Sequence, residues 1–123
     1  MRKELPLDLQ DLLYWYKAEL VRVVDGDTII VNIDLGLNGQ RNKVRLRFLE
    51  IDAAEMRGSE AEQGEAAKQH LKQLLPPEGG TVVIHTHKDV QDNWGRLLAE
   101  VFFGGRNIGH QMLEDGYAKR WER

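Results

Sequence analysis

Two tight-turn dipeptides divide the first half of the chain and restrict most strongly what it can fold into. Asp25-Gly26 separates the run WYKAELVRVV from TIIVNID, and Asn38-Gly39 precedes the run KVRLRFLEI. Each run is rich in β-branched residues and alternates apolar with polar side chains, as half-buried strands do. Glycine in such a turn supplies the positive φ that a two-residue hairpin loop needs. The sequence therefore predicts a three-stranded antiparallel meander, whose twist favours curling toward a barrel.

The second half of the chain alternates helical and strand patterns. Residues 59–75 are rich in helix formers, and Ser59 followed by Glu62 fits a capping box. The runs TVVIHTHK and RLLAEVFF predict two further strands, and residues 106–116 predict a short helix that ends at Gly116. The order β-β-β-α-β-β-α is the plan of the OB-fold, a mainly β member of the α+β class with a five-stranded Greek-key barrel and flanking helices. Other α+β arrangements of the same elements also fit this order.

Length and composition limit the class of protein. The chain has 123 residues, the size of one domain, and we expect residues 1–13 to form an N-terminal arm and residues 14–123 the OB-fold domain. Because the chain has no cysteine, disulfides, thiolate metal sites and thiol nucleophiles are excluded. The formal net charge of -3 argues against coating nucleic acid by bulk charge, so any contact with nucleic acid has to be local.

The sequence also bears on location. No run approaches the roughly 20 apolar residues of a membrane span. Glu4, Asp8 and Asp11 interrupt the N-terminal stretch where a signal peptide needs an apolar core. We therefore expect a cytoplasmic protein, or a secreted one if a leader has been removed, with no membrane contact and no obligate protein partner.

Four acidic residues lie at the ends of predicted strands. Asp25 and Asp27 flank Gly26, where an Asp most often hydrogen-bonds its own backbone. Asp52 ends the third strand and Glu55 follows it closely, and a single acid at a strand end is usually just solvated. Hard cations such as Ca²⁺ and Mg²⁺ need several oxygen ligands, which carboxylates from two strand ends could supply together.

Arginines lie close to these acids. Arg45 and Arg47 share one face of the third strand with Leu49 and Ile51, so Arg47 is expected where a wet face becomes a dry one. An arginine there is well placed to hold a phosphate or a carboxylate with its planar fork of donors. Arg45 and Arg96 fit a surface charge equally well on this pattern.

The remaining candidates are aromatic. His85 and His87 alternate on a strand, which could suggest a metal pair, but no third ligand lies nearby in sequence and a surface or packing role is the more ordinary interpretation. Trp15, Trp94 and Trp121 are more often packing residues than platforms for stacked bases, although each could stack a base if exposed.

Three blocks of sequence carry a family resemblance. VVDGDT at 23–28, RFLEIDAAE at 47–55 and NWGRLLAEVF at 93–102 resemble, in order, the signature blocks of the staphylococcal nuclease (thermonuclease) family. The resemblance implies a five-stranded OB-type barrel with flanking helices. It also implies a Ca²⁺-dependent phosphodiesterase that acts on nucleic acid, DNA or RNA or both.

The resemblance also implies a metal site. By position, the carboxylates of Asp27 and Asp52 match the family's calcium ligands, and the backbone carbonyl of Ala53 matches the third protein ligand. Asp25 matches an acid that lies near the metal without binding it directly. Where the family commonly has Thr-Pro, this chain has Ala53-Ala54, and without the rigid proline we expect a softer loop and weaker metal binding.

Three further positions match the family's catalytic residues. Arg47 and Arg96 match the two arginines that clamp the scissile phosphate, and Glu55 matches the general base for the attacking water. The chemistry agrees, because water attack on a phosphodiester builds negative charge that fixed positive groups stabilise, and the water needs a base nearby. The alternative is an OB-fold module that binds nucleic acid or protein without cutting, for which a base such as Glu55 has no use.

Overall fold

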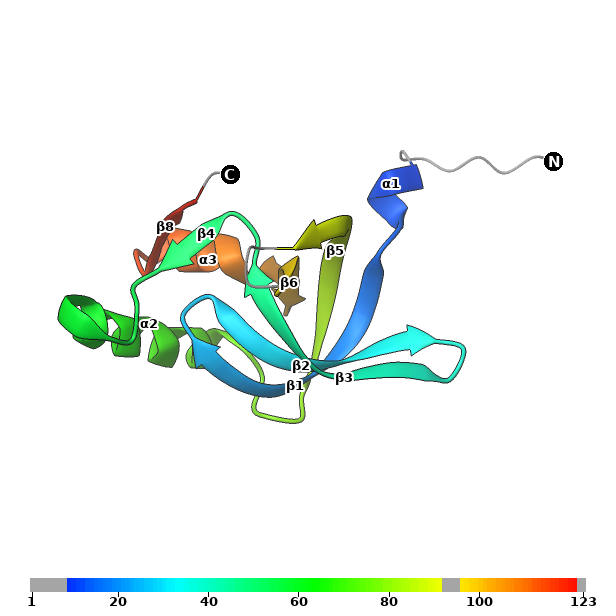
Figure 1. The fold of residues 1–123 in the computed structure, drawn as a ribbon, viewed down its shortest axis with the longest axis horizontal. Coiled ribbons are helices and arrows are strands. Elements are labelled where there is room, and N and C mark those ends of the chain that lie inside the picture. The colour runs from blue at the N-terminus through cyan, green and yellow to red at the C-terminus, as the bar shows by residue number, and fades with distance from the viewer. Residues whose placement is uncertain (1–8, 92–95, 122–123) are drawn as a thin grey trace.

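Five strands close into a barrel in the computed structural model, which describes residues 9–91 and 96–121 (Figure 1). These strands are β1 (Trp15–Asp25), β2 (Thr28–Gly36), β3 (Gly39–Phe48), β5 (Thr81–Gln91) and β6 (Leu97–Phe103). Neighbours pair in the order β3-β2-β1-β5-β6, all antiparallel, and a parallel pairing of β3 with β6 closes the ring. The predicted OB-type barrel is therefore confirmed.

Helices and short strands complete the barrel. They are α1 (Leu9–Leu12), β4 (Ile51–Ala53), the 3₁₀ helix η1 (Gly58–Glu60), α2 (Ala61–Leu74), β7 (Arg106–Asn107), α3 (Ile108–Glu114) and β8 (Ala118–Arg120). The antiparallel pair of β4 and β8 lies next to α3 (Figure 1). No helix in the described part of the chain is long and apolar enough to cross a membrane. Of the N-terminal arm expected at 1–13, residues 1–8 lie outside the described residues.

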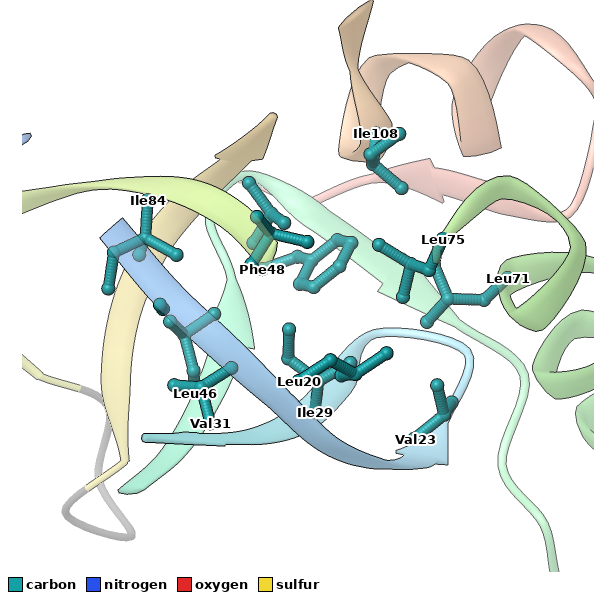
Figure 2. Packing of buried hydrophobic residues seen from close by; sticks show 14 of the residues in the cluster. Leu20, Val23, Ile29, Val31, Leu46, Phe48, Leu71, Leu75, Ile84 and Ile108 are labelled. Carbon is teal, nitrogen blue, oxygen red and sulfur yellow. The ribbon is translucent and has the colours of Figure 1, made fainter. Parts of the chain in front are cut away.

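Alternating strand residues point into the barrel and form the core. Inward positions such as Leu20, Ile29 and Leu46 are almost completely buried, as period-two alternation requires. Phe48, at the end of β3, packs between the barrel interior and Leu71 of α2 (Figure 2). Each large side chain buried in this way stabilises the fold by about 1.5–3 kcal/mol relative to leaving it exposed.

Gly26 is needed for space and not for a positive φ, so the sequence-based reason for this glycine was wrong. A Cβ atom at Gly26 would lie 2.7 Å from the Cβ atoms of both Ala53 and Ala67. The turn between β1 and β2 therefore packs directly against β4 and α2. The close approach holds the backbone beside Asp27 against the segment that follows β3.

The turn between β2 and β3 is shifted by one residue from the predicted Asn38-Gly39. Its central residues are Leu37 and Asn38, with φ of 54° and 63°, whereas Gly39 already belongs to β3. Positive φ at both central residues is what a type I′ hairpin turn requires. Leu37 is fully exposed at the tip of this hairpin, which extends away from α2 (Figure 1).

Helix α2 begins differently from the prediction. The capping box is absent: Ser59 lies in η1, the N-cap is Glu60, and no side chain makes the cap hydrogen bond. The helix is fixed instead by close packing at Gly64. A Cβ atom at Gly64 would lie only 2.1 Å from the backbone oxygen of Glu55.

We predict that Gly64→Ala destabilises the protein. Alanine normally stabilises an open helix position relative to glycine by up to about 1 kcal/mol. Here the added methyl meets backbone atoms of Glu55 and Met56, and such overpacking costs about 1–3 kcal/mol. Urea unfolding measures the change, with Gln63→Ala at an exposed position of the same helix as control. A Gly64→Ala variant as stable as the parent would contradict the close contact.

Candidate active site

An open cleft of about 420 Å³ lies at one end of the barrel, between the β1–β2 turn, the β3–β4 region and the start of β6. Its lining residues are Val24, Asp25, Asp27, Arg47, Asp52, Ala53, Ala54, Glu55, Met56, Arg57 and Arg96. All the site residues expected from the sequence are among them. Segments far apart in the chain thus bring every one of these residues to a single cleft.

Arg47 is buried at the centre of this cleft. It is 7% exposed, and its Nη2 lies 3.1 Å from Asp52 Oδ1 and 3.5 Å from Asp27 Oδ2. Its guanidinium carbon lies 4.9 Å from the ring centre of Trp121, within the range of a cation–π contact. A buried charge needs partners, and two carboxylates and an aromatic face supply them here. The side chain is therefore held in place among the residues that line the cleft.

Asp27 is the cleft residue whose pKa departs clearly from its ordinary value. Its Oδ2 accepts a hydrogen bond from the Ala53 N–H at 2.9 Å, and its Oδ1 accepts one from the Thr28 hydroxyl at 3.0 Å. Burial, followed by the neighbouring Asp25 carboxyl, raises the pKa of Asp27 to about 6, while the Ala53 N–H and Arg47 act in the opposite direction. The folded protein therefore concentrates more negative charge here than its own donors compensate.

Asp25 affects this site through a side-chain hydrogen bond within the turn as well as through its charge. Its Oδ1 accepts a hydrogen bond from the Asp27 N–H at 3.1 Å, the local turn bond that an Asp in this position commonly makes. The turn-stabilising interpretation is therefore confirmed for Asp25, and the functional interpretation of this segment stays a prediction. Asp25 shapes the turn, and Asp27 presents its carboxylate to the cleft.

Glu55 and Arg96 reach the cleft from separate segments. Glu55 is exposed on the loop after β4 and also lines a second depression of about 340 Å³, together with Tyr117 and Lys119. Arg96 is half-buried and directly precedes β6, the strand that pairs in parallel with β3 and sets Leu98 opposite Arg47. Arg47 and Arg96 therefore line the same cleft because the barrel closes between β3 and β6.

The loop with Ala53-Ala54 has supports that the sequence did not indicate. Ala53 pairs with Ala118 of β8, and its side chain packs against Gly26. The expected softness of this loop stays a prediction, but strand pairing and the contact with Gly26 both support Ala53.

Trp121 is the site residue that sequence reasoning missed as a partner of Arg47. Its backbone N–H donates to the Glu50 carbonyl at 2.9 Å, which places the ring over Arg47. The sequence offered only a general signal, an aromatic residue suited to packing or stacking. Arg45 is exposed, in agreement with a surface charge, and the predicted Asn93-Trp94 segment lies outside the described residues.

We predict that Asp27→Asn stabilises the metal-free protein at alkaline pH. Because the pKa in the folded state, about 6, is above the ordinary value of 3.8, stability is lost as the pH rises through this interval. The cost is fully present above it. An amide carries no charge, so at pH 8 in chelator the variant should gain about 1–3 kcal/mol, and much less at pH 4.

Urea unfolding at both pH values provides the measurement, and Glu78→Gln, at an exposed loop carboxylate, is the matched control. An Asp27→Asn variant less stable than the parent at pH 8 would show that the carboxylate's hydrogen bonds outweigh its burial.

Comparison with known proteins identifies relatives that cover most of this chain. The model of a family described as staphylococcal nuclease homologue matches residues 45–123. Endonuclease YncB of Bacillus subtilis (strain 168) is 33% identical over 104 residues, which cover 81% of this chain and 46% of that protein. The SPbeta prophage-derived endonuclease YokF of the same organism is 35% identical over 104 residues, covering 81% of this chain and 32% of its own.

A third relative, the micrococcal nuclease of Shigella flexneri, is 34% identical over 112 residues, with 84% of this chain and 57% of that protein covered. The chain thus spans about half the length, or less, of these curated relatives. The family match includes Arg47, Asp52, Glu55 and Arg96, and Asp27 precedes it. With the barrel and the cleft in the arrangement that the sequence blocks implied, the chain belongs to the staphylococcal nuclease family.

Proposed function

We propose that this protein is a Ca²⁺-dependent nuclease that hydrolyses phosphodiester bonds in DNA, RNA or both. One observation carries the proposal: two arginines, the carboxylates of Asp27 and Asp52, and an exposed glutamate line the same cleft. Nuclease relatives support the same class of activity. In this proposal residues 14–123 form the catalytic domain, with residues 1–13 as an arm.

Arg47 and Arg96 would bind the scissile phosphate. A planar guanidinium can donate two parallel hydrogen bonds to a phosphate, and it keeps its charge at every pH of interest. Within the cleft, Arg47 donates to Asp52 and contacts Asp27. A phosphate therefore has to compete with these carboxylates for the hydrogen-bond donors of Arg47. It competes best when a bound cation neutralises the carboxylates.

The donor set of the cleft fits a hard divalent cation. Asp27 and Asp52 offer carboxylate oxygens, Ala53 offers a backbone carbonyl, and calcium prefers ligands of this kind. Burial and the neighbouring Asp25 carboxyl raise the pKa of Asp27, and a bound cation would favour its charged form. Bound calcium would supply positive charge beside the phosphoryl oxygens as the reaction adds to their charge.

Glu55 would take the proton from the attacking water. It lies on the loop after β4, exposed between the main cleft and the neighbouring depression, so water has access to its carboxylate. Gly64 of α2 contacts the Glu55 backbone and limits how far the loop can move. In this proposal a solvent-accessible base would act beside the buried arginine that binds the phosphate.

The proposal predicts cleavage of single-stranded DNA by the purified protein with Ca²⁺ and loss of cleavage with a calcium chelator. Gel analysis of a labelled oligonucleotide, followed by re-addition of excess Ca²⁺, measures both directions. Negligible cleavage with and without Ca²⁺, at ample protein, would favour the non-catalytic binding module instead.

A second prediction concerns Glu55→Gln. The amide cannot accept the proton, so kcat should fall by about 100-fold or more, the usual contribution of a general base. Thermal unfolding should be unchanged because Glu55 is exposed. Glu62→Gln, at an exposed position on α2, is the control that should leave both properties intact. Unchanged turnover in Glu55→Gln would remove Glu55 from the role of base.

A further inference from the structure

A cluster of side chains of the types that commonly bind metals lies on the outer face of the barrel and shares no residue with the cleft. His85 and His87 alternate along β5, and Glu100 lies opposite His85 on β6. His85 Nδ1 is 3.1 Å from Glu100 Oε1, and His87 Nε2 is 3.7 Å from the same oxygen. The sequence offered the histidine pair without a third ligand, and the neighbouring strand supplies it.

The ligand atoms of these residues are close enough for one ion. One atom from each of His85, His87 and Glu100 can be chosen so that all lie within 4.8 Å of one another. Zinc binds imidazole nitrogen and carboxylate oxygen at about 2.0–2.2 Å, so two of its tetrahedral ligands lie about 3.4 Å apart. The two histidine–glutamate distances are already close to this value, and side-chain rotation has to shorten any longer separation by up to about 1.4 Å.

His87 Nε2 gives an independent reason to expect a ligand. The nitrogen atom itself is buried, although the His87 side chain as a whole is 42% exposed. It has no hydrogen-bond partner in the described part of the chain, and its contact with Glu100 is longer than a hydrogen bond. An unsatisfied buried polar atom costs about 1–3 kcal/mol, so such atoms are uncommon in native proteins. A metal ion bound to this nitrogen would satisfy it.

Neighbouring residues fix the orientation of Glu100 and His85. Asn107 Nδ2 donates to Glu100 Oε2 at 3.2 Å, which leaves Oε1 facing the histidines. Asn107 is itself fixed, because its Oδ1 accepts from the His110 N–H at the start of α3. The Trp15 ring stacks on His85 at 4.1 Å and 8°. Metal ligands in proteins are commonly oriented by contacts of this kind.

We propose that His85, His87 and Glu100 bind a zinc ion that links β5 to β6, with water completing its coordination. Two imidazoles and one carboxylate are a zinc-type donor set, whereas Ca²⁺ and Mg²⁺ require six or more oxygen ligands, water included. The site is thus chemically distinct from the oxygen-lined cleft. Because the ligands come from two paired strands, zinc stabilises the folded state and not the unfolded chain.

Binding and stability test the proposal without any cleavage assay, so the result is independent of the proposed nuclease activity. Protein freed of metal with a chelator is titrated with ZnCl₂ by calorimetry, and its thermal unfolding is followed with ZnCl₂, CaCl₂ or MgCl₂. We expect one zinc per chain and a rise in Tm of several degrees when zinc is in large excess over its dissociation constant. Calcium and magnesium should not reproduce this binding at the histidine cluster.

Variants locate the site. His87→Gln and Glu100→Gln should each weaken zinc binding at least tenfold and remove the rise in Tm, whereas His110→Gln, an exposed histidine on α3, should change neither. Asp52→Asn should also retain zinc binding, because it alters the cleft alone. Absence of zinc binding, or binding that survives both His87→Gln and Glu100→Gln, would overturn the proposal. Circular dichroism of His87→Gln verifies that the fold is intact.

Discussion

The parallel pairing of β3 with β6 is the contact on which the rest of the structure depends. It sets Leu46 opposite Leu97, Arg47 opposite Leu98 and Phe48 opposite Ala99, and it leaves neither strand as an open edge there. The same pairing encloses the core around Phe48 and brings the segment of Arg96 beside Arg47. The pairing that closes the barrel therefore also assembles the cleft. A substitution that weakens this pairing is expected to affect both the stability of the protein and the cleft.

The cleft is built at some expense of stability, which the core offsets. Arg47 and Asp27 are both buried, and burial of charge is unfavourable unless partners compensate it. The compensation is incomplete at Asp27, whose raised pKa records the imbalance. Sites that must attract a cation or a phosphate commonly carry such unrelieved charge. The apolar barrel and the two helices that cover its end supply the stability that makes this arrangement tolerable.

Local patterns in the sequence were enough for the five barrel strands and the two main helices, because alternation and turn chemistry act over a few residues. The short strands β4, β7 and β8 were not predicted, and the residues of the cleft were indicated by the family resemblance. Local sequence patterns could not indicate contacts between segments that lie far apart in the chain. The space filled by Ala53 and Ala67 explains Gly26, and Gly64 replaces the predicted cap as the feature that fixes α2. Glu100 joins the histidines only through strand register. Trp121 reaches Arg47 only because β8 pairs with β4.

The β2–β3 hairpin has a practical consequence for joining this protein to other molecules. β2 begins beside Asp27 and continues for 9 residues to Gly36, so its tip is held roughly 30 Å along the strand direction from the cleft. The tip carries the fully exposed Leu37 and a turn that depends on few contacts. A tether, a fused domain or a surface linkage attached at this turn would leave the cleft facing free solution, with the hairpin acting as a spacer.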